Sequence, residues 1–412
     1  VRAAGAGTLT VTADSDNALG GDFTSTAAGT LDTAGGGITV SATNATVGGD
    51  ITTAAANIFV TALLHSGTTF TNQADVAAGG GSSVTVRFDA YDLQAGSTIG
   101  TTGAGEVNLR VNTGGVGMDL GSAAAGANFT QAELDTVTAA QLRLTAAADI
   151  AFSQNIVLAV AKVPTLVLEA AGGVVDGTAA ETTLLTVQSL ALKTGTGIGD
   201  ADDLNVAVSN LAFRNATSGN VDISNTGALT IASVFDVTTS SNAGAGSTSV
   251  SAASPLTFAV NTTSVGPATY TAGETSDFPA CADDLTVNAG VTVSVTGPGN
   301  ALILRAGDDV VIDGTASAAG ALQLIAGFND LDGCGTVVIN GTISGNPITI
   351  SAPNDICVTT LNVGASALIL ISTGGAILDC DPVGADDLDI TAGSLSLRAA
   401  TGIGTAAGTG GV

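Results

Sequence analysis

The segment Leu395-Ser-Leu-Arg-Ala-Ala-Thr-Gly-Ile-Gly404 has an earlier counterpart, Leu190-Ala-Leu-Lys-Thr-Gly-Thr-Gly-Ile-Gly199. A second matching pair precedes them, Leu368-Ile-Leu-Ile-Ser-Thr-Gly-Gly-Ala-Ile-Leu378 and Leu166-Val-Leu-Glu-Ala-Ala-Gly-Gly-Val-Val-Asp176. The copies are offset by 205 and 202 residues, close to half of the 412-residue chain. Long internal repeats are typical of proteins built by stacking similar units. We therefore expect one continuous solenoid over residues 1–412, with repeat halves at about 1–205 and 206–412.

Short stretches of alternating apolar and polar residues recur along the whole chain. They are three to six residues long, and Gly, Asn, Asp or Ser separates them; examples are 8–12, 84–88, 107–111, 204–208, 285–288 and 348–350. A period of two residues indicates β-strands. One stretch differs, because Thr130 can act as an N-cap and Glu133 can complete a capping box. We expect a single short helix there.

The composition decides among three all-β architectures. There are 56 Gly, 45% hydrophobic residues, only 3% aromatic residues and no Trp. Tandem sandwiches would need larger core residues and linkers, and a propeller would need blades of about 40–50 residues. Small and β-branched side chains suit a thin core between stacked coils. The chain is therefore predicted to be a parallel β-helix (β-solenoid) with irregular coils of about 20–25 residues.

The charge of the chain excludes some partners. Nine Lys and Arg residues oppose 36 Asp and Glu residues, which gives a formal net charge of −27. Such a field repels nucleic acid and anionic membranes and favours divalent cations. No stretch is long and apolar enough to be a membrane-spanning helix. Because the chain begins partway through a repeat, we expect it to be a mature or excised piece of a longer polypeptide.

The cysteine spacing follows the expected coil length. Cys334, Cys357 and Cys380 are each 23 residues apart, and Cys281 lies 53 residues before Cys334. Stacked coils bring Cα atoms to about 5 Å, which is within disulfide range. Of the three possible connectivities we favour Cys357–Cys380 with Cys281–Cys334; the alternative is that the cysteines are unpaired core residues. Disulfides would indicate an oxidising, extracytoplasmic setting.

Pairs of aspartates precede several strands. They are Asp202 with Asp203, Asp283 with Asp284, Asp308 with Asp309, and Asp386 with Asp387, and Asp200 adds a third carboxylate to the first pair. Neighbouring carboxylates supply the hard oxygen ligands that Ca²⁺ prefers. The alternative is that Asp begins a strand after a turn by accepting hydrogen bonds from backbone N–H groups. Calcium is the one cofactor that the sequence brings into consideration.

The sequence predicts no catalytic residues, and we expect that the protein is not an enzyme. His65 is the only histidine, and we assign it to a turn or the surface rather than to a serine triad. Polysaccharide-cleaving β-helices need carboxylate clusters and aromatic platforms, but this chain has two Tyr and no Trp. A carbohydrate-binding or polysaccharide-cleaving β-helix is kept as the alternative function.

Several segments resemble repeats of very large bacterial surface proteins, the filamentous-haemagglutinin-like and autotransporter-like β-strand-repeat proteins. These segments are 129–143, 213–231, 302–312, 341–343 and 395–404. The resemblance covers most of the chain and implies a right-handed parallel β-helix, export to the cell surface, and a role in adhesion or extracellular fibres. It implies no shared catalytic residues. The chain departs from this group in having cysteines.

The leading hypothesis is a structural or adhesive segment of an extracellular, cell-surface bacterial fibre. The end of a β-helix exposes unpaired strand edges, which favours head-to-tail stacking on another copy or on adjacent repeats. Cell-surface glycans are the other expected partner, and nucleic acid and a membrane span are not expected. A calcium-stabilised adhesin is a further alternative.

Overall fold

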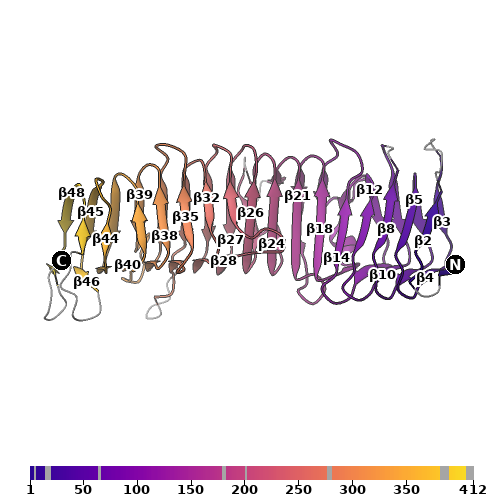
Figure 1. Cartoon of the computed structure of the whole chain (residues 1–412), viewed down its shortest axis with the longest axis horizontal. Coiled ribbons are helices and arrows are strands. Elements are labelled where there is room, and N and C mark those ends of the chain that lie inside the picture. Colours follow the sequence, from indigo (N-terminus) through magenta and orange to yellow (C-terminus); the bar gives the residue numbers. More distant parts are fainter. Residues whose placement is uncertain are drawn as a thin grey trace. The chain divides into compact units, whose positions relative to one another are not determined.

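The protein is a parallel β-solenoid of about 15 turns with almost no helix. The computed structural model describes residues 1–3, 6–13, 20–63, 66–178, 182–199, 202–275, 281–380 and 389–404. The chain divides into two compact units, Val1–Ala207 and Val208–Val412. The boundary lies within a few residues of the boundary between the two repeat halves. Figure 1 shows the strands of each unit stacked coil upon coil.

In the first unit the longest stack consists of eight parallel strands. They are β2 (Leu9–Thr12), β5 (Ile38–Ala42), β8 (Ile58–Ala62), β11 (Val84–Arg87), β14 (Glu106–Arg110), β18 (Gln141–Ala146), β21 (Thr165–Ala170) and β24 (Ser189–Thr194). We call the sheet that they form face B.

The other strands of this unit form the remaining faces. One stack is β1 (Arg2–Ala3), β4 (Leu31–Thr33), β7 (Ile51–Thr53), β10 (Asp75–Ala78), β13 (Thr98–Thr101) and β17 (Val137–Thr138). Another is β3 (Phe23–Ser25), β6 (Ala45–Val47), β9 (Thr69–Asn72) and β12 (Ala90–Leu93). Shorter stacks are β16 (Asn128–Phe129), β15 (Met118–Leu120), β19 (Ile150–Phe152) and β22 (Val174–Asp176), and β20 (Ile156–Val157), β23 (Leu185–Thr186) and β25 (Leu204–Ala207).

The second unit has three long stacks. The first is β27 (Val221–Asn225), β30 (Thr248–Ala252), β33 (Ala268–Ala272), β36 (Leu302–Ala306), β39 (Leu322–Ile325), β42 (Ile348–Ala352), β45 (Ala367–Ser372) and β48 (Ser394–Arg398). The second is β28 (Leu229–Ile231), β31 (Leu256–Phe258), β34 (Leu285–Val287), β37 (Val310–Ile312), β40 (Val337–Ile339), β43 (Ile356–Val358), β46 (Ala376–Asp379) and β49 (Gly402–Ile403).

The third stack is β29 (Ser240–Asn242), β32 (Thr262–Ser264), β35 (Thr292–Val295), β38 (Thr315–Ala318) and β41 (Thr342–Ser344). The longer strand β26 (Asn210–Asn215) pairs with both β28 and β29, so the second and third stacks diverge from it. A short pair, β44 (Leu361–Asn362) with β47 (Ile390–Thr391), completes the unit.

Coil length varies more than the sequence predicts. Ile38 pairs with Ile58, so that coil takes 20 residues. Val107 pairs with Leu142, so the third coil after it takes 35 residues. The expected range of 20–25 residues is therefore too narrow. The extra residues of the 35-residue coil form β15, β16 and the only helix in the described ranges, α1 (Gln131–Leu134), which has the predicted capping box between Thr130 and Glu133.

The core consists of rows of identical or similar side chains that stack from coil to coil. On face B one inward row runs through Val40, Val60, Val86, Leu109, Leu144, Leu168 and Leu192, each fully buried. Because parallel strands are in register, an aliphatic residue in one coil always covers another. This packing needs no large aromatic residue at its centre.

Aromatic residues of neighbouring coils cluster in the core of the first unit. Phe70 lies 5.6 Å from Phe88, and Tyr91 lies 5.0 Å from Phe129, measured between ring centroids. The buried Tyr91 hydroxyl donates to a backbone carbonyl oxygen, with Val86 O at 3.0 Å and Arg110 O at 2.6 Å. Burial raises the pKa of Tyr91 well above its usual range, because the charged form would be desolvated. The four rings therefore pack against one another in the core.

Buried amides also stack. The Asn215 side chain donates to the Asn242 Oδ1 atom at 3.0 Å, and both residues are fully buried. Each Nδ2 also contacts turn carbonyl oxygens of its own coil, such as Ser218 O for Asn215 and Gly246 O for Asn242. The asparagines thus satisfy turn carbonyls that would otherwise be buried without a donor.

The inward and outward positions of β36 provide a test of this packing. Leu304→Ala should lower the free energy of unfolding by about 2–5 kcal/mol, because Leu304 is fully buried between Tyr270 and Leu324 in register. Ile303→Ala, on the adjacent outward position, should cost about 1 kcal/mol or less. Urea unfolding followed by circular dichroism measures both. Equal losses would contradict the assigned faces.

Candidate functional site

The structure brings together two of the predicted aspartate pairs. Asp283 and Asp284 precede β34, Asp308 and Asp309 precede β37, and Leu285 pairs with Val310. The two pairs therefore lie one coil apart on the same side of the second unit. Asp202 and Asp203 precede β25 in the first unit and are not part of this group. The remaining predicted ligands, Asp200, Asp386 and Asp387, lie outside the described residues, as does His65.

Most of these carboxylates bind backbone N–H groups of the neighbouring coil. Asp308 Oδ2 accepts from Asp283 N at 2.8 Å, and Asp284 Oδ1 accepts from Asp309 N at 3.1 Å. Asp309 Oδ1 accepts from Thr336 N at 2.6 Å. The pairs therefore hold one turn on the next, which is the strand-starting role that the sequence left open beside calcium binding.

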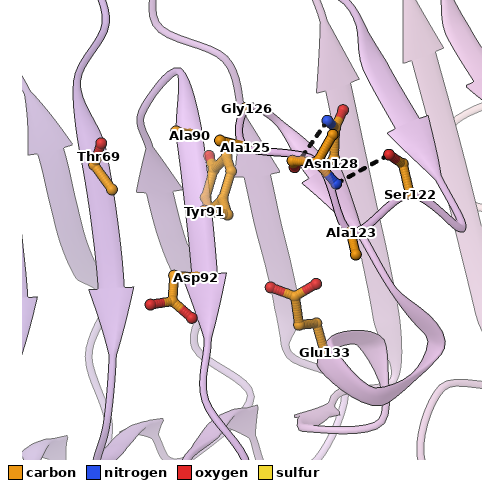
Figure 2. A pocket seen from close by; sticks show the side chains of 11 residues that line it. Thr69, Ala90, Tyr91, Asp92, Ser122, Ala123, Ala125, Gly126, Asn128 and Glu133 are labelled. Atoms are coloured by element: carbon orange, nitrogen blue, oxygen red, sulfur yellow. Dashed lines mark hydrogen bonds between the residues drawn. The ribbon is translucent and has the colours of Figure 1, made fainter.

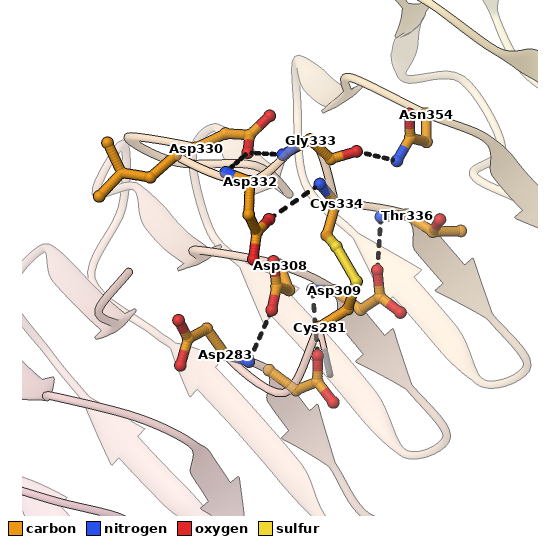
Figure 3. The surroundings of a disulfide bond; sticks show 12 residues. Cys281, Asp283, Asp308, Asp309, Asp330, Asp332, Gly333, Cys334, Thr336 and Asn354 are labelled. Carbon is orange, nitrogen blue, oxygen red and sulfur yellow. Dashed lines mark hydrogen bonds between the residues drawn. A yellow bond between two sulfur atoms is a disulfide. The ribbon is translucent and has the colours of Figure 1, made fainter. Parts of the chain in front are cut away.

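Both disulfides follow the pairing favoured from the cysteine spacing. Cys281 is bonded to Cys334 and Cys357 to Cys380, with Cα–Cα distances of 5.8 and 5.6 Å. The second bond joins adjacent coils, since Cys357 lies on β43 and Cys380 follows β46. The first skips a coil: Cys281 precedes β34 and Cys334 precedes β40, and β37 lies between these strands. The two turns that carry Cys281 and Cys334 thus meet over the turn of Asp308 (Figure 3).

Three further carboxylates lie at this disulfide, those of Glu274, Asp330 and Asp332. Asp330 Oδ1 accepts from Asp332 N and Gly333 N, and Asp332 Oδ1 accepts from Cys334 N at 3.1 Å. Glu274 Oε2 and Asp332 Oδ2 are buried and have no hydrogen-bond partner. Sequence reasoning missed these residues because they do not form Asp-Asp pairs. The acidic, glycine-containing run before Cys334 was the available signal. We call Glu274, Asp283, Asp284, Asp308, Asp309, Asp330 and Asp332 the acidic cluster.

The acidic cluster has perturbed ionisation. Burial, together with the charges of Asp309, Asp308 and Asp283, raises the pKa of Asp284 to about 6. Burial is also the main cause that raises the pKa of Glu274, and Asp308, Asp332 and Asp283 add to it. Asp284 and Glu274 are thus harder to ionise beside the neighbouring carboxylates. A cation placed among them would relieve this repulsion.

The geometry of the cluster limits which cation would fit. Within the described ranges, ligand atoms of Asp308, Asp332 and Cys334 lie within 4.8 Å of one another. The Cys334 sulfur belongs to a disulfide and cannot act as a thiolate, so a zinc site is not favoured. Oxygen ligands remain, and these suit a hard cation such as Ca²⁺. Arg305 does not neutralise the acidic cluster, since its guanidinium lies over the Phe328 ring, 3.9 Å from the ring centroid.

A pocket of about 300 Å³ lies in the first unit, beside the long coil. Tyr91, Asp92 and Glu133 face it, and residues 122–126 form its rim (Figure 2). Glu133 is already engaged, because Oε1 accepts from Leu93 N and Oε2 accepts from Thr130 N and Oγ1. This carboxylate holds α1 in place. The pocket is therefore lined by small and polar side chains, and one of its carboxylates is committed to donors of the protein itself.

Comparison of the chain with protein-family models, with curated proteins and with solved structures finds no match.

Among the described residues, no helix has the length and apolar character needed to cross a membrane. Two disulfides are a feature of proteins from oxidising compartments.

The raised pKa of Asp284 predicts a pH dependence of stability. The folded pKa of about 6 exceeds the unfolded value of about 3.9, so the folded state binds this proton more tightly. The stabilisation is fully present below about pH 4 and is lost as the pH rises through about 6. The melting temperature of the second unit should therefore rise when the pH is lowered from about 7.5 to about 5.

Asp284→Asn should reduce this rise, and Asp313→Asn, at an exposed position of the same unit, should leave it in place. Differential scanning calorimetry at the two pH values measures the effect. A pH dependence that is the same in both variants would remove Asp284 as its source.

Proposed function

We propose that the protein is a structural and adhesive segment of an extracellular, cell-surface bacterial fibre, with no catalytic role. Its support is the uninterrupted stacking of coils in each unit, together with the resemblance to filamentous-haemagglutinin-like and autotransporter-like surface proteins. In such a segment backbone hydrogen bonds and a continuous aliphatic core carry the load, and the acidic surface keeps neighbouring fibres soluble. The two disulfides are consistent with export to an oxidising environment.

The observation that carries this proposal is the exposed core face of β48 and β49, the last strands that the structure describes. Leu395 and Ile403 are 48% and 51% exposed. Their register partners one coil earlier, Leu368 and Ile377, are 1% and 0% exposed. A further coil, from a second copy or from adjacent repeats, would bury these side chains and pair the free strand edge. The interface would be heterologous, and heterologous interfaces that do not close produce filaments.

Charges on this face should prevent assembly. Leu395→Asp combined with Ile403→Asp should abolish self-association, because each new carboxylate would be buried against an apolar coil. Ser396→Asp is the matched control, since Ser396 lies on the same strand at an outward position. Light scattering at micromolar concentration and electron microscopy measure the outcome. A wild-type chain that stays a monodisperse monomer would refute head-to-tail assembly of this segment.

A second candidate function is calcium-dependent stabilisation of the same segment, in which the acidic cluster binds the ion. The specific support is the pair of buried carboxylate oxygens without a hydrogen-bond partner, Glu274 Oε2 and Asp332 Oδ2. Together with Asp308 they would offer oxygen ligands from three successive turns. Such a site would lock these turns together only where calcium is plentiful, as it is outside cells.

Millimolar CaCl₂ should raise the melting temperature of the second unit by about 2–4 °C or more, and EDTA should reverse the rise. Asp332→Asn should remove most of this rise in melting temperature, because the substitution removes the negative charge that Asp332 Oδ2 would offer to the ion. Asp313→Asn, away from the cluster, should respond to calcium as the wild type does. Scanning calorimetry decides the matter: unchanged melting with calcium and with EDTA would dismiss this candidate.

A further inference from the structure

Two arginines stack in register on face B. Arg87 on β11 pairs with Arg110 on β14, and the outward row continues through Thr61 on one side and Thr145 on the other. Adjacent strands lie about 4.8 Å apart, so both side chains leave the sheet as direct neighbours. Like charges in directly opposite positions destabilise a sheet. In a chain with only nine Lys and Arg residues, this juxtaposition calls for a compensating interaction.

The same face shows how other cations are compensated. Arg143 Nε lies 2.7 Å from Glu106 Oε1, and Arg143 Nη1 lies 2.7 Å from Glu169 Oε2. Lys193 Nζ lies 3.1 Å from the same Glu169 oxygen. Burial raises the pKa of Glu169, but the hydrogen bonds from Lys193 and Arg143 outweigh it, and the net shift is downward. Both carboxylates of this network are therefore committed to Arg143 and Lys193.

No such partner serves Arg87 and Arg110 among the residues that the structure describes. Arg87 Nη2 donates to Asn112 O at 3.3 Å, and Arg87 Nε is buried without a hydrogen-bond partner. Arg110 is exposed and makes no ion pair within the described ranges. Asp89 follows β11, but its carboxylate accepts from Gly67 N, Asn112 N, and Thr113 N and Oγ1. It is saturated by the turns that it holds.

A shallow depression of about 280 Å³ lies beside Arg110, toward the following coils, and Arg87 does not line it. Arg110, Thr145 and Glu169 line it, together with alanines of the following turns. The neighbouring outward residues of face B are mainly hydroxyl and amide side chains, such as Thr85 and Asn108, and Phe59 is 39% exposed. The surface is thus flat, polar and locally positive on a strongly acidic chain.

We propose that Arg87 and Arg110 form an anion-binding site for the carboxylate or sulfate groups of an acidic polysaccharide. The proposal deepens the proposed adhesive function and rests on it. Two guanidinium groups can hold one carboxylate or sulfate with several charge-assisted hydrogen bonds, and such an anion would remove the repulsion between them. The hydroxyl and amide side chains around the pair would contact sugar hydroxyls.

A second copy of the chain is the less suitable occupant. Stable protein interfaces bury about 1,200 Å² or more and are centred on buried aromatic or aliphatic anchors. The area around Arg87 and Arg110 is small and polar. A hydrated polysaccharide needs no such large apolar interface, because one anionic group can be held by the two guanidinium groups alone.

The test compares two double variants that each remove two positive charges. Arg87→Gln with Arg110→Gln should weaken binding to an acidic polysaccharide by about tenfold or more, since charge-assisted hydrogen bonds are lost. Lys162→Gln with Arg214→Gln removes two other exposed cations, of which Lys162 donates to Asp135 O at 2.6 Å. These changes should alter the affinity by about twofold or less. Biolayer interferometry at low ionic strength, with polygalacturonate, dextran sulfate and uncharged dextran as probes, measures the affinities. Polygalacturonate and dextran sulfate separate carboxylate from sulfate recognition, and added NaCl should weaken either.

Several results would overturn the proposal. The proposal fails if the wild-type protein binds neither polyanion, or if it binds uncharged dextran equally well. It also fails if the control variant loses as much affinity as Arg87→Gln with Arg110→Gln. A second result would also overturn it. If the wild type binds no polyanion but self-associates, and Arg87→Gln with Arg110→Gln abolishes that self-association, then face B contacts another copy of the chain. Melting curves of both variants exclude unfolding as the cause. Filament formation is measured on the same samples. If the chain binds polyanions but never assembles, the anion-binding site is supported and the proposed fibre function is refuted.

Discussion

Parallel, in-register hydrogen bonding between successive coils is the constraint on which this structure depends. A parallel ladder lets every strand bond to the coil before it and the coil after it, so that a residue's neighbours are set by its position along the ladder. Inward rows such as Val60, Val86 and Leu109 become continuous aliphatic columns for this reason. Outward rows obey the same rule, which makes each face of the solenoid a regular array of side chains. Both the core and the surface chemistry follow from one geometric repeat.

Polar groups are organised by the same repeat. The turn asparagines Asn215 and Asn242 stack in the core, and the aspartates before β34 and β37 accept hydrogen bonds from backbone groups of the adjacent coil. Charged side chains on face B form a network wherever the ladder places opposite charges within reach, as with Arg143. Sites of interest are those where the repeat sets charges beside each other without compensation. Within the part of the chain that the structure describes, the acidic cluster is a negatively charged example and the Arg87–Arg110 pair a positively charged one.

The sequence predicts the fold because the fold is local. Alternation of apolar and polar residues, glycine-rich turns and the long repeat all arise from contacts with adjacent coils, so they are visible in a single chain. The capping box at Thr130 and the disulfide partners were accessible for the same reason. Coil length was predicted less well, since the residues that lengthen the coil between Val107 and Leu142 carry no periodic pattern. Glu274 and Asp332 lie on turns of different coils that come close to each other. The periodicity of the strands does not predict which turns come together.

The disulfide between Cys281 and Cys334 has a mechanical consequence. A stacked protein under tension unravels from an end, one coil after another, and each detached coil adds its contour length to the chain. The bond closes a span of 53 residues, and a fully extended span of this size would measure about 180 Å. Because the covalent link bypasses the intervening coil, a pulling force passes through the two sulfur atoms and leaves that loop slack. The residues between the two cysteines therefore bear no tension, and they add no contour length when the solenoid is pulled.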